Sequence, residues 1–351
     1  MKYIYLITFV CLLNINIRAQ IPSNDPHWKL IFEDDFTTLN TSAWKVFNNF
    51  DHYAGVYNPP LPAESWLRKL VFLNKSTNVR VDNGALIIQM NKENYTCPSS
   101  SLVGWGCSNQ EQTGNSYQYT SGMVESVNQD YLYGYIEARI KIPDALGLNN
   151  AFWTINKDGL SYAEIDIFEM LPGATIDNIY HNNSIMSSNI HTSSPGSIPG
   201  GTFKINHVNN FTNYHIYSIE WTPDKILFYV DGKIVRNSTN PGIFQPSRIR
   251  FNIGFSDWCN PVISNPIMSI DYIRIYQLEH ECSAIVNSCT YNFSSHNNKV
   301  KKSITIGGSG CSNNLISGQN VVLRATDGIE IKGDFSVPLG AEFYADVNQC
   351  Y

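Results

Sequence analysis

The chain has 351 residues, of which 43% are hydrophobic and 15% charged, and its formal net charge is −6. This length supports one large domain and a small one, with ample chain to build a core. Because the charge balance is acidic, nucleic acid and acidic membrane surfaces are poor partners.

The first residues predict export. Lys2 supplies a positive charge, Tyr3 to Leu13 form an apolar run, and Ile17-Arg18-Ala19 offers a small-residue exit before Gln20. This pattern is typical of a secretory signal peptide over residues 1–19. The apolar run is too short to span a bilayer as a permanent anchor, and the rest of the sequence holds no other transmembrane candidate. We therefore expect a secreted chain, extracellular, cell-surface or periplasmic, without membrane insertion.

From Trp28 onward, short runs of strand-forming residues alternate with Gly, Asn, Asp and Pro, a pattern typical of an antiparallel sandwich. The clearest hairpin runs from Asn78 to Glu93 and turns at Asn83-Gly84, and a second one turns at Asp231-Gly232. No stretch shows a helix cap followed by three turns of helical periodicity. The sequence predicts an all-β domain.

The segment AEIDIFEM places three carboxylates among Ile and Phe. Alternate side chains of a strand share a face, so Glu164 and Asp166 would point to one side while the isoleucines enter a core. Glu169 breaks this alternation, and a regular strand would bury its charge in the apolar layer. If Ile167 and Phe168 together oppose one residue of the neighbouring strand, as in a β-bulge, Glu169 returns to the face of the other two acids.

A row of three acids has two interpretations. Most charged side chains lie in water, so a solvated sheet face is the ordinary explanation. Like charges in a row repel, however, and no cation is interleaved here, so the cluster costs stability and indicates a function. Retaining glycosidases place two carboxyl groups about 5 to 5.5 Å apart, one as nucleophile and one as acid and then base. Alternate positions on one strand face give this scale of separation.

The motif, in its bulged E-x-D-x-x-E form, looks like the signature of glycoside hydrolase family 16, and the resemblance extends over roughly Trp28 to Gln277. The family includes laminarinases, mixed-linkage glucanases, agarases, porphyranases and carrageenases. Other phrases match the family in order: LIFEDDF (Leu30 to Phe36), SGMVES (Ser121 to Ser126), YGYIEARIKIP (Tyr133 to Pro143), AFWTI (Ala151 to Ile155), NIHTSS (Asn189 to Ser194), IEWTPDKILFYVDGK (Ile219 to Lys233) and SIDYIRIYQ (Ser269 to Gln277).

This resemblance implies a catalytic domain over residues 20–279, folded as a jelly-roll β-sandwich whose concave sheet forms a cleft for the sugar chain. It also implies that Glu164 is the nucleophile, that Glu169 is the general acid and base, and that Asp166 between them tunes the proton. Such chemistry requires no cofactor.

The resemblance leaves the substrate open. Because Lys and Arg are sparse and scattered, a neutral polymer is favoured, and we expect a monomer that cleaves β-1,3-glucan or mixed β-1,3-1,4-glucan within the chain. The alternatives are an agarase- or porphyranase-type β-galactan hydrolase, a transglycosylase, or a non-catalytic glucan-binding protein on the same fold. Binding-only relatives lose the catalytic glutamates, which are present here.

Three further residues are candidates for substrate binding. Trp153 and Trp258 resemble positions where family members stack a tryptophan on a sugar ring, although packing in the core is the alternative for each. His191 belongs to the strand after the acids, where relatives carry a histidine near the reacting centre. A lone histidine is more often an ordinary core or surface residue, but here it could orient a carboxylate or a sugar hydroxyl.

Many family members bind calcium near the two chain ends of the domain, on the convex side. Asp35 and Asp271 fall in the matching phrases, and carboxylate oxygens suit this ion. The alternative, two ordinary surface acids, is the stronger one because backbone carbonyls supply much of such coordination. A structural calcium ion is therefore a weak hypothesis.

After Gln277 the composition becomes rich in Asn and Ser, which predicts a linker over residues 280–302. Residues 303–351 hold brief alternating runs punctuated by glycine and resemble the small β-stack tail of secreted Bacteroidetes enzymes. Since every candidate catalytic residue precedes position 280, this small all-β domain is expected to fold independently and to be dispensable for chemistry.

Seven cysteines lie outside the signal peptide, and an exported chain allows them to pair. None has the CxxC spacing of a zinc site. The expected bridges are Cys97–Cys107 together with Cys282–Cys289 or Cys311–Cys350, with Cys259 as the free thiol.

Overall fold

The computed structural model describes residues 25–48, 72–96, 116–127, 131–156, 162–176, 178–193, 200–201, 204–255, 265–294 and 299–351. Within these ranges the chain is almost entirely strand, and the helical element is one 3-10 turn, η3 (Ser76–Asn78). The predicted all-β class is confirmed.

Eight strands form the first large sheet, called here the β9 sheet, in the order β19-β18-β17-β9-β21-β5-β4 with β1 paired to β21. All of its pairings are antiparallel. Its strands are β1 (Trp28–Asp34), β4 (Val79–Asp82), β5 (Ala85–Gln89), β9 (Gly134–Lys141), β17 (His215–Trp221), β18 (Lys225–Val230), β19 (Lys233–Thr239) and β21 (Ile267–Leu278).

The second large sheet, the β11 sheet, has the order β15-β14-β11-β10-β20-β8-β2 with β16 paired to β14, and it is also antiparallel. Its strands are β2 (Trp44–Val46), β8 (Met123–Ser126), β10 (Leu148–Asn156), β11 (Tyr162–Met170), β14 (Ile185–Ser193), β15 (Gly200–Gly201), β16 (Lys204–His207) and β20 (Ser247–Phe255). Two small sheets lie beside it, one of β3 (Phe72–Asn74), β6 (Asn91–Thr96) and β7 (Ser116–Ser121), and one of β12 (Thr175–Ile176) and β13 (Ile179–Tyr180).

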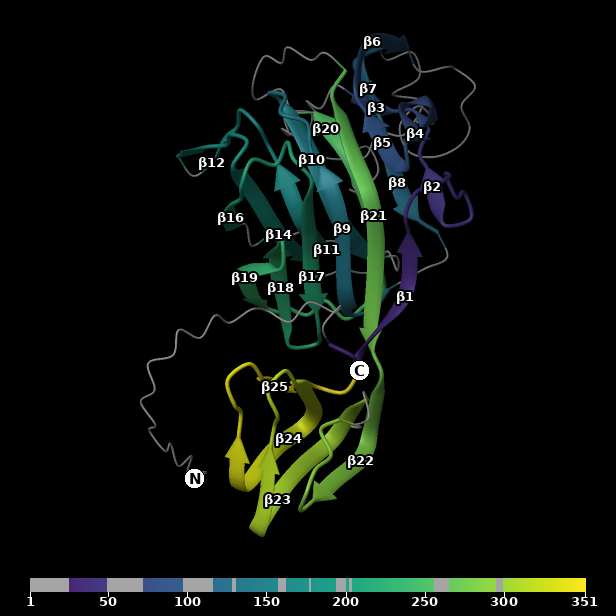
Figure 1. Ribbon diagram of the computed structural model, residues 1–351. Coiled ribbons are helices and arrows are strands. Elements are labelled where there is room, and N and C mark those ends of the chain that lie inside the picture. Colours follow the sequence, from purple (N-terminus) through teal and green to yellow (C-terminus); the bar gives the residue numbers. More distant parts are fainter. Residues whose placement is uncertain are drawn as a thin grey trace.

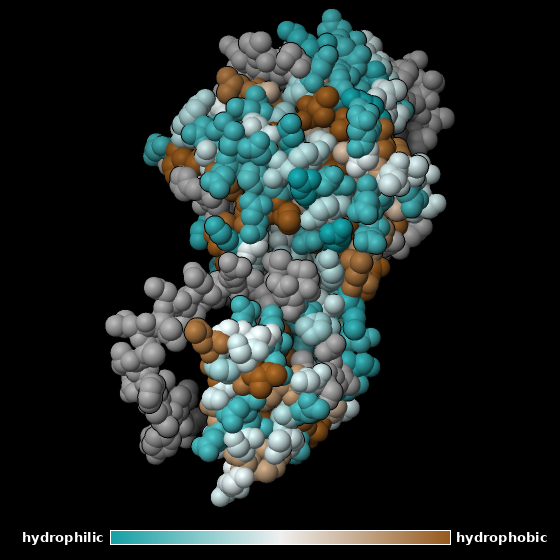
Figure 2. Space-filling view, in the orientation of Figure 1, coloured by the Kyte–Doolittle hydropathy of each residue, from teal (hydrophilic) through white to brown (hydrophobic). Residues whose placement is uncertain are grey.

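The two large sheets pack face to face as a sandwich (Figure 1), and a single apolar cluster fills the space between them. Aromatic rings bridge the layers: Phe168 on β11 and Tyr217 on β17 have ring centroids 4.6 Å apart. Trp44 and Trp221 are fully buried, as framework residues should be. Figure 2 shows one outside face of the molecule, where hydrophilic residues predominate and apolar ones are scattered, in keeping with strands that alternate between core and solvent.

Both predicted hairpin turns are confirmed. Asn83 and Gly84 join β4 to β5 with φ angles of 50° and 73°, and Asp231 and Gly232 join β18 to β19 with φ angles of 50° and 72°. Two successive left-handed residues give the twist that fits tightly paired strands, and Asn, Asp and Gly adopt this conformation at low cost.

The C-terminal residues form a third unit, a four-stranded parallel sheet in the order β22-β23-β24-β25. Its strands are β22 (His280–Ser288), β23 (Val300–Asn314), β24 (Asn320–Ser336) and β25 (Glu342–Val347). They enclose their own apolar cluster, which includes Ile306, Val321 and Leu323. The segment 280–302 was expected to be a linker, but most of its described residues belong to β22 and the start of β23. Ser283, Asn287 and Ser288 of this segment lie in β22, a strand whose alternate side chains are half-buried.

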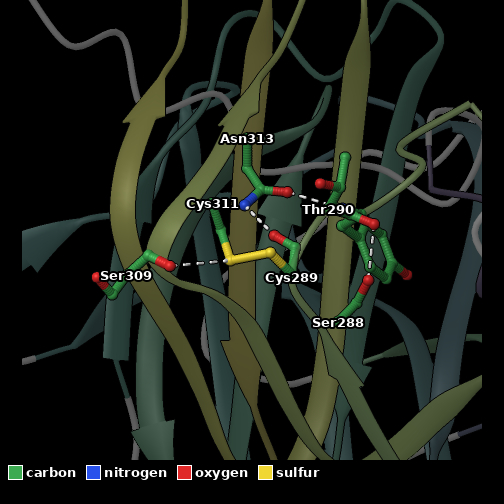
Figure 3. Close-up of a disulfide and its surroundings, with 7 residues drawn as sticks. Ser288, Cys289, Thr290, Ser309, Cys311 and Asn313 are labelled. Carbon is green, nitrogen blue, oxygen red and sulfur yellow. Dashed lines mark hydrogen bonds between the residues drawn. A yellow bond between two sulfur atoms is a disulfide. The ribbon is translucent and has the colours of Figure 1, made fainter.

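The disulfides differ from the expected pairs. Cys282 bonds to Cys350 and Cys289 bonds to Cys311, with Cα atoms 6.1 and 5.3 Å apart. A chain coiled into parallel strands brings together residues one full coil apart, and Cys289 and Cys311 are 22 positions apart. In Figure 3 the Asn313 amide donates to the Cys289 carbonyl at 2.9 Å beside this bridge. Cys97, Cys107 and Cys259 lie outside the described residues.

A buried ion cluster joins this C-terminal unit to the start of the sandwich. The guanidinium of Arg324, on β24, is 2.7 Å from Asp25 and 2.5 Å from Asp346, and its side chain is 3% exposed. Burial raises the pKa of Asp25, but the His27 hydrogen bond and the Arg324 charge outweigh it, so that pKa falls to about 2. The ring of Trp28 lies 5.6 Å from the same guanidinium.

The last residues dock on the sandwich as well. The ring of Tyr351 lies 4.7 Å from Tyr133 and 4.5 Å from His280, and the Gln349 amide donates to Asp224 at 2.6 Å. The Cys282–Cys350 bridge ties this terminus to β22. These contacts argue against a tail that folds independently of the sandwich.

Replacing Arg324 with methionine should lower the free energy of unfolding by about 3–5 kcal/mol, because two carboxylates then stay buried without their cation. Urea unfolding of the intact chain measures this. Lys302→Met is the matched control, since Lys302 makes a longer, exposed pair with Asp327. Equal unfolding free energies for the two variants would show that the cluster does not hold the units together.

Candidate active site

Strand β11 carries the three acids, and its pairing with both neighbours contains one extra residue. On β14, Asp166 pairs with Asn189 and Glu169 with Ser187, so three steps along β11 match two along β14. On β10 the register shifts at the same place, between Phe152 and Trp153. The predicted β-bulge is therefore confirmed.

The bulge keeps apolar residues inside and acids outside. Ile165, Ile167 and Phe168 are 0–1% exposed within the core of the sandwich. The carboxyl groups of Glu164 and Asp166 lie on the opposite, outer face of the β11 sheet, where each is paired by register with a polar residue of β14. Alternation alone would have placed Glu169 in the core, and the extra residue prevents this.

Strand β14 brings His191 to the acids. Its Nε2 lies 3.2 Å from Asp166 Oδ2 and 3.7 Å from Glu164 Oε1, and one oxygen or nitrogen of each of the three residues lies within 4.8 Å of the others. The contact with Asp166 has the distance of an ion pair without the geometry of a hydrogen bond. Asn149 on β10 donates to Glu169 Oε1 at 3.4 Å. Two flanking strands thus supply the polar partners of the acid row.

The environment favours protonation of two of the acids. Burial raises the pKa of Asp166 well above its ordinary value and the Glu169 charge raises it further, while a hydrogen bond with Glu164 and the Arg236 charge oppose the rise. Burial also raises the pKa of Glu169, opposed by His191 and by the Asn149 hydrogen bond. Closely spaced buried carboxyl groups cannot all ionise freely, so protons are retained in this row at higher pH than in water.

Trp153 lies on the same outer face, since it pairs with Asp166 on one side and Arg250 on the other. Its indole N–H donates to Asn252 at 2.7 Å, and the Arg250 guanidinium lies 4.8 Å from the ring centroid. The ring is 3% exposed and packs with Phe47 in a small apolar cluster. The structure thus places Trp153 beside the acids, as expected of a subsite residue, but packed against its neighbours and not as an open platform.

Sequence reasoning missed a pair of arginines beside this ring. Arg248 and Arg250 on β20 both bind Glu125 of β8, at 2.9 and 2.5 Å, and the Glu125 side chain is 3% exposed. The alternation R-I-R in a strand indicated that both would share a face, but nothing in the sequence indicated that this face carries the acids. The fold therefore places two guanidinium groups on the face that carries the acids.

The comparisons with known proteins agree with this geometry. Residues 68–274 match the family model described as glycosyl hydrolases family 16. The chain belongs to this family. The acid row on β11 therefore sits where the family's signature motif was recognised in the sequence.

Two curated relatives and one solved structure illustrate the range of similar family 16 proteins. Glucan endo-1,3-beta-glucosidase A1 of Niallia circulans is 28% identical over 71% of this chain and 38% of its own length. Kappa-carrageenase of Pseudoalteromonas carrageenovora is 32% identical over 47% of this chain and 44% of its own length. The endo-beta-1,3-glucanase of Pyrococcus furiosus has 25% identity and a TM-score of 0.55, covering 72% of this chain and 95% of that one.

This chain spans less than half the length of the first curated relatives that it matches, at 38, 35 and 36%. Among the described residues there is no helix with the length and apolar character needed to cross a membrane.

The residues suggested for calcium do not fit that ion. Asp35 lies 3.7 Å from the Arg274 guanidinium, and Asp271 lies 2.6 Å from that of Arg139. Each carboxylate thus has a cation beside it where the ion would need negative charge. Trp258, the other predicted subsite residue, lies outside the described residues.

The raised pKa of Asp166 gives a prediction about stability. Because the folded state holds this proton more tightly than the unfolded chain, the free energy of unfolding falls as pH rises above the ordinary aspartate pKa, about 4. Asparagine cannot ionise. Asp166→Asn should therefore be more stable than the parent at pH 7, with a smaller difference at pH 4, while activity falls.

Urea unfolding at the two pH values measures this difference. The control is Asp35→Asn, because Asp35 is an exposed acid on the side of the β9 sheet. If the difference in unfolding free energy between Asp166→Asn and the parent is the same at pH 4 and pH 7, the pKa of Asp166 is not raised.

Proposed function

We propose that this chain is a secreted, endo-acting, retaining hydrolase of β-linked polysaccharide. The observation that carries the proposal is the acid row of Glu164, Asp166 and Glu169, which the bulge turns to one face of β11 in a chain of family 16. A binding protein would need no such row of acids, because closely spaced like charges cost stability.

The roles are those that the family motif implies, and the raised pKa of Glu169 supports its part as proton donor. Glu164, joined to Asp166 by a hydrogen bond and 3.7 Å from His191, is the nucleophile. Its carboxylate attacks the anomeric carbon while the glycosidic C–O bond breaks and the leaving oxygen takes the proton of Glu169. Water then attacks the glycosyl-enzyme, Glu169 takes a proton from that water, and the bond to Glu164 breaks. The anomeric configuration is retained because both displacements invert it.

Asp166 and His191 support these two steps. Asp166 lies between the two glutamates, so its charge and its hydrogen bond with Glu164 govern which carboxyl group holds a proton. His191 is 26% exposed in its side chain and lies within 3.7 Å of both Glu164 and Asp166, where it orients a carboxylate or a sugar hydroxyl.

The leading substrate is β-1,3-glucan or mixed β-1,3-1,4-glucan. It is supported by the net charge of −6 and by the relative named as an endo-1,3-beta-glucosidase. A β-galactan hydrolase of the agarase or porphyranase type is the second candidate. It is favoured by the guanidinium of Arg250 over the Trp153 ring, by Arg248 on the same strand face, and by the relative named as a kappa-carrageenase. Glu125 offsets part of that positive charge, which keeps the neutral glucan ahead.

Export is part of the proposal and rests on the N-terminal pattern at residues 1–19. The two disulfides of the C-terminal unit support it, since such bonds persist in oxidising compartments. A monomer and a reaction without a cofactor stay predictions. Calcium is not proposed, because its two candidate ligands are paired with arginines.

The proposed function predicts new reducing ends when the mature chain is incubated with laminarin or lichenan. Agarose, porphyran and carrageenan test the second candidate, and the absence of cleavage in all five would overturn the proposal. Proton NMR of the first products should show the β-anomer, because double displacement retains configuration. Initial release of the α-anomer would exclude this mechanism.

The roles of the two glutamates can be separated by substitution. Glu164→Ala should abolish hydrolysis, and azide should restore turnover by occupying the vacated space, yielding a glycosyl azide of inverted configuration. Glu169→Ala should lose activity on polysaccharide but retain more on an aryl glycoside whose leaving group needs no proton. Glu137→Ala, on β9 of the other sheet, is the control. Full activity of Glu164→Ala would show that the site is elsewhere.

A further inference from the structure

A buried arginine lies between the sheets without a place in the mechanism described so far. Arg236 is on β19, its residue is 5% exposed, and its guanidinium lies 4.9 Å from the ring centroid of Phe228 inside the apolar core. Moving a guanidinium out of water is costly unless hydrogen bonds and negative charge compensate for it. The residues around Arg236 supply both the hydrogen bonds and the negative charge.

The hydrogen bonds of Arg236 lead to the strand beside the acids. Its Nη1 donates to the carbonyl oxygen of Ser188 at 2.9 Å and to the hydroxyl oxygen of the same residue at 3.2 Å. Ser188 is fully buried and lies between the partners of Asp166 and Glu169, so it is the residue that opposes the bulge. An arginine of the β9 sheet is therefore hydrogen-bonded to the β11 sheet at the residue opposite the bulge, which sets the spacing of Asp166 and Glu169.

The charge of Arg236 acts on the same place. It lowers the pKa of Asp166, and the Asp166 charge in turn raises that of Arg236, although burial outweighs this effect on the arginine. The other ionisable groups facing Asp166 are Glu164 and Glu169 on its own strand and His191 on β14. On β10 its neighbour is the uncharged Trp153, beyond which lies Arg250. Arg236 thus adds a positive charge behind a row of acids.

We propose that Arg236 is a positioning residue for hydrolysis, which holds β14 against the bulge through Ser188 and places a positive charge behind Asp166. The inference rests on the proposed function of the acid row. Arg236 contacts neither substrate nor reacting atoms in this assignment; it acts through Ser188 and Asp166.

Two substitutions separate the two parts of this role. Arg236→Gln keeps a hydrogen-bond donor for Ser188 but removes the charge, whereas Arg236→Lys keeps the charge with a different donor geometry. The matched control is Arg274→Gln. Arg274 also covers an aromatic ring, that of Tyr272 at 4.2 Å, and it lies 3.7 Å from Glu33, but it is on the outer side of the β9 sheet.

Kinetics on the polysaccharide that the parent cleaves should show a fall in kcat on the order of 10- to 100-fold for Arg236→Gln, with little change in KM, because a misplaced acid row slows the reacting step. The acid limb of its kcat/KM profile should move to higher pH, since the acid row loses a positive charge that opposes the rise in the pKa of Asp166. Arg236→Lys should restore the acid limb to the parent position and recover part of kcat. Arg274→Gln should match the parent in both.

A purely structural arginine would give a different result, with lower melting temperatures but an unchanged pH profile and unchanged kcat in the folded fraction of Arg236→Gln. That outcome overturns the proposal. If Arg236→Gln does not fold, Arg236→Lys carries the test: a change in KM alone, or an acid limb displaced from that of the parent, overturns it.

A readout without substrate separates this inference from the proposed function. Carboxyl carbon NMR titration of Asp166 should give a higher pKa in Arg236→Gln than in the parent. If the pKa rises and the parent cleaves none of the five polysaccharides, the proposed function fails while the electrostatic link stands. If the parent is active and the pKa does not move, the role of Arg236 fails and the proposed function stands.

Discussion

One additional residue in β11 is the constraint on which the site depends. A strand at the centre of a sandwich must present apolar side chains to the core, and Ile165, Ile167 and Phe168 do so. Three acids on its other face do not fit the strand period of two. The bulge at residues 167–168 resolves this conflict, because it moves the alternation by one position after Asp166. Core packing and the geometry of the acid row are thus set by the same local departure from regular pairing.

This part of the structure could be predicted from the sequence because it depends on residues close together in the chain. The odd spacing between Glu164 and Glu169 within an apolar strand required an irregularity, and the turn pairs Asn83-Gly84 and Asp231-Gly232 have few alternative conformations. The acid row and the hairpins could therefore be predicted from neighbouring residues. The family resemblance added the sandwich and the roles of the acids, which local spacing alone could not supply.

Long-range partners could not be predicted in this way. Arg236 binds Ser188 across 48 positions, Arg250 binds Glu125 across 125, and Arg324 binds Asp25 across 299. No periodicity connects such pairs, so the positions of the arginines in the sequence did not indicate their partners. The linker predicted over residues 280–302 was wrong for the same reason. A composition rich in Asn and Ser suggests a linker, and only the neighbouring parallel strand shows that the segment is part of a sheet.

These distant contacts also explain how the fold tolerates its site. A buried row of like-charged acids, with a guanidinium held in the core behind it, works against stability. Contacts at the far end of the sandwich are stabilising. Arg324 pairs with two carboxylates there, and Tyr351 packs on Tyr133. The Cys282–Cys350 disulfide fixes the chain terminus beside them. Because β21 runs from the sandwich directly into β22, these contacts and the catalytic sheets belong to one continuous frame. The C-terminal unit is therefore better understood as part of the scaffold that supports the acid row than as a detachable appendage.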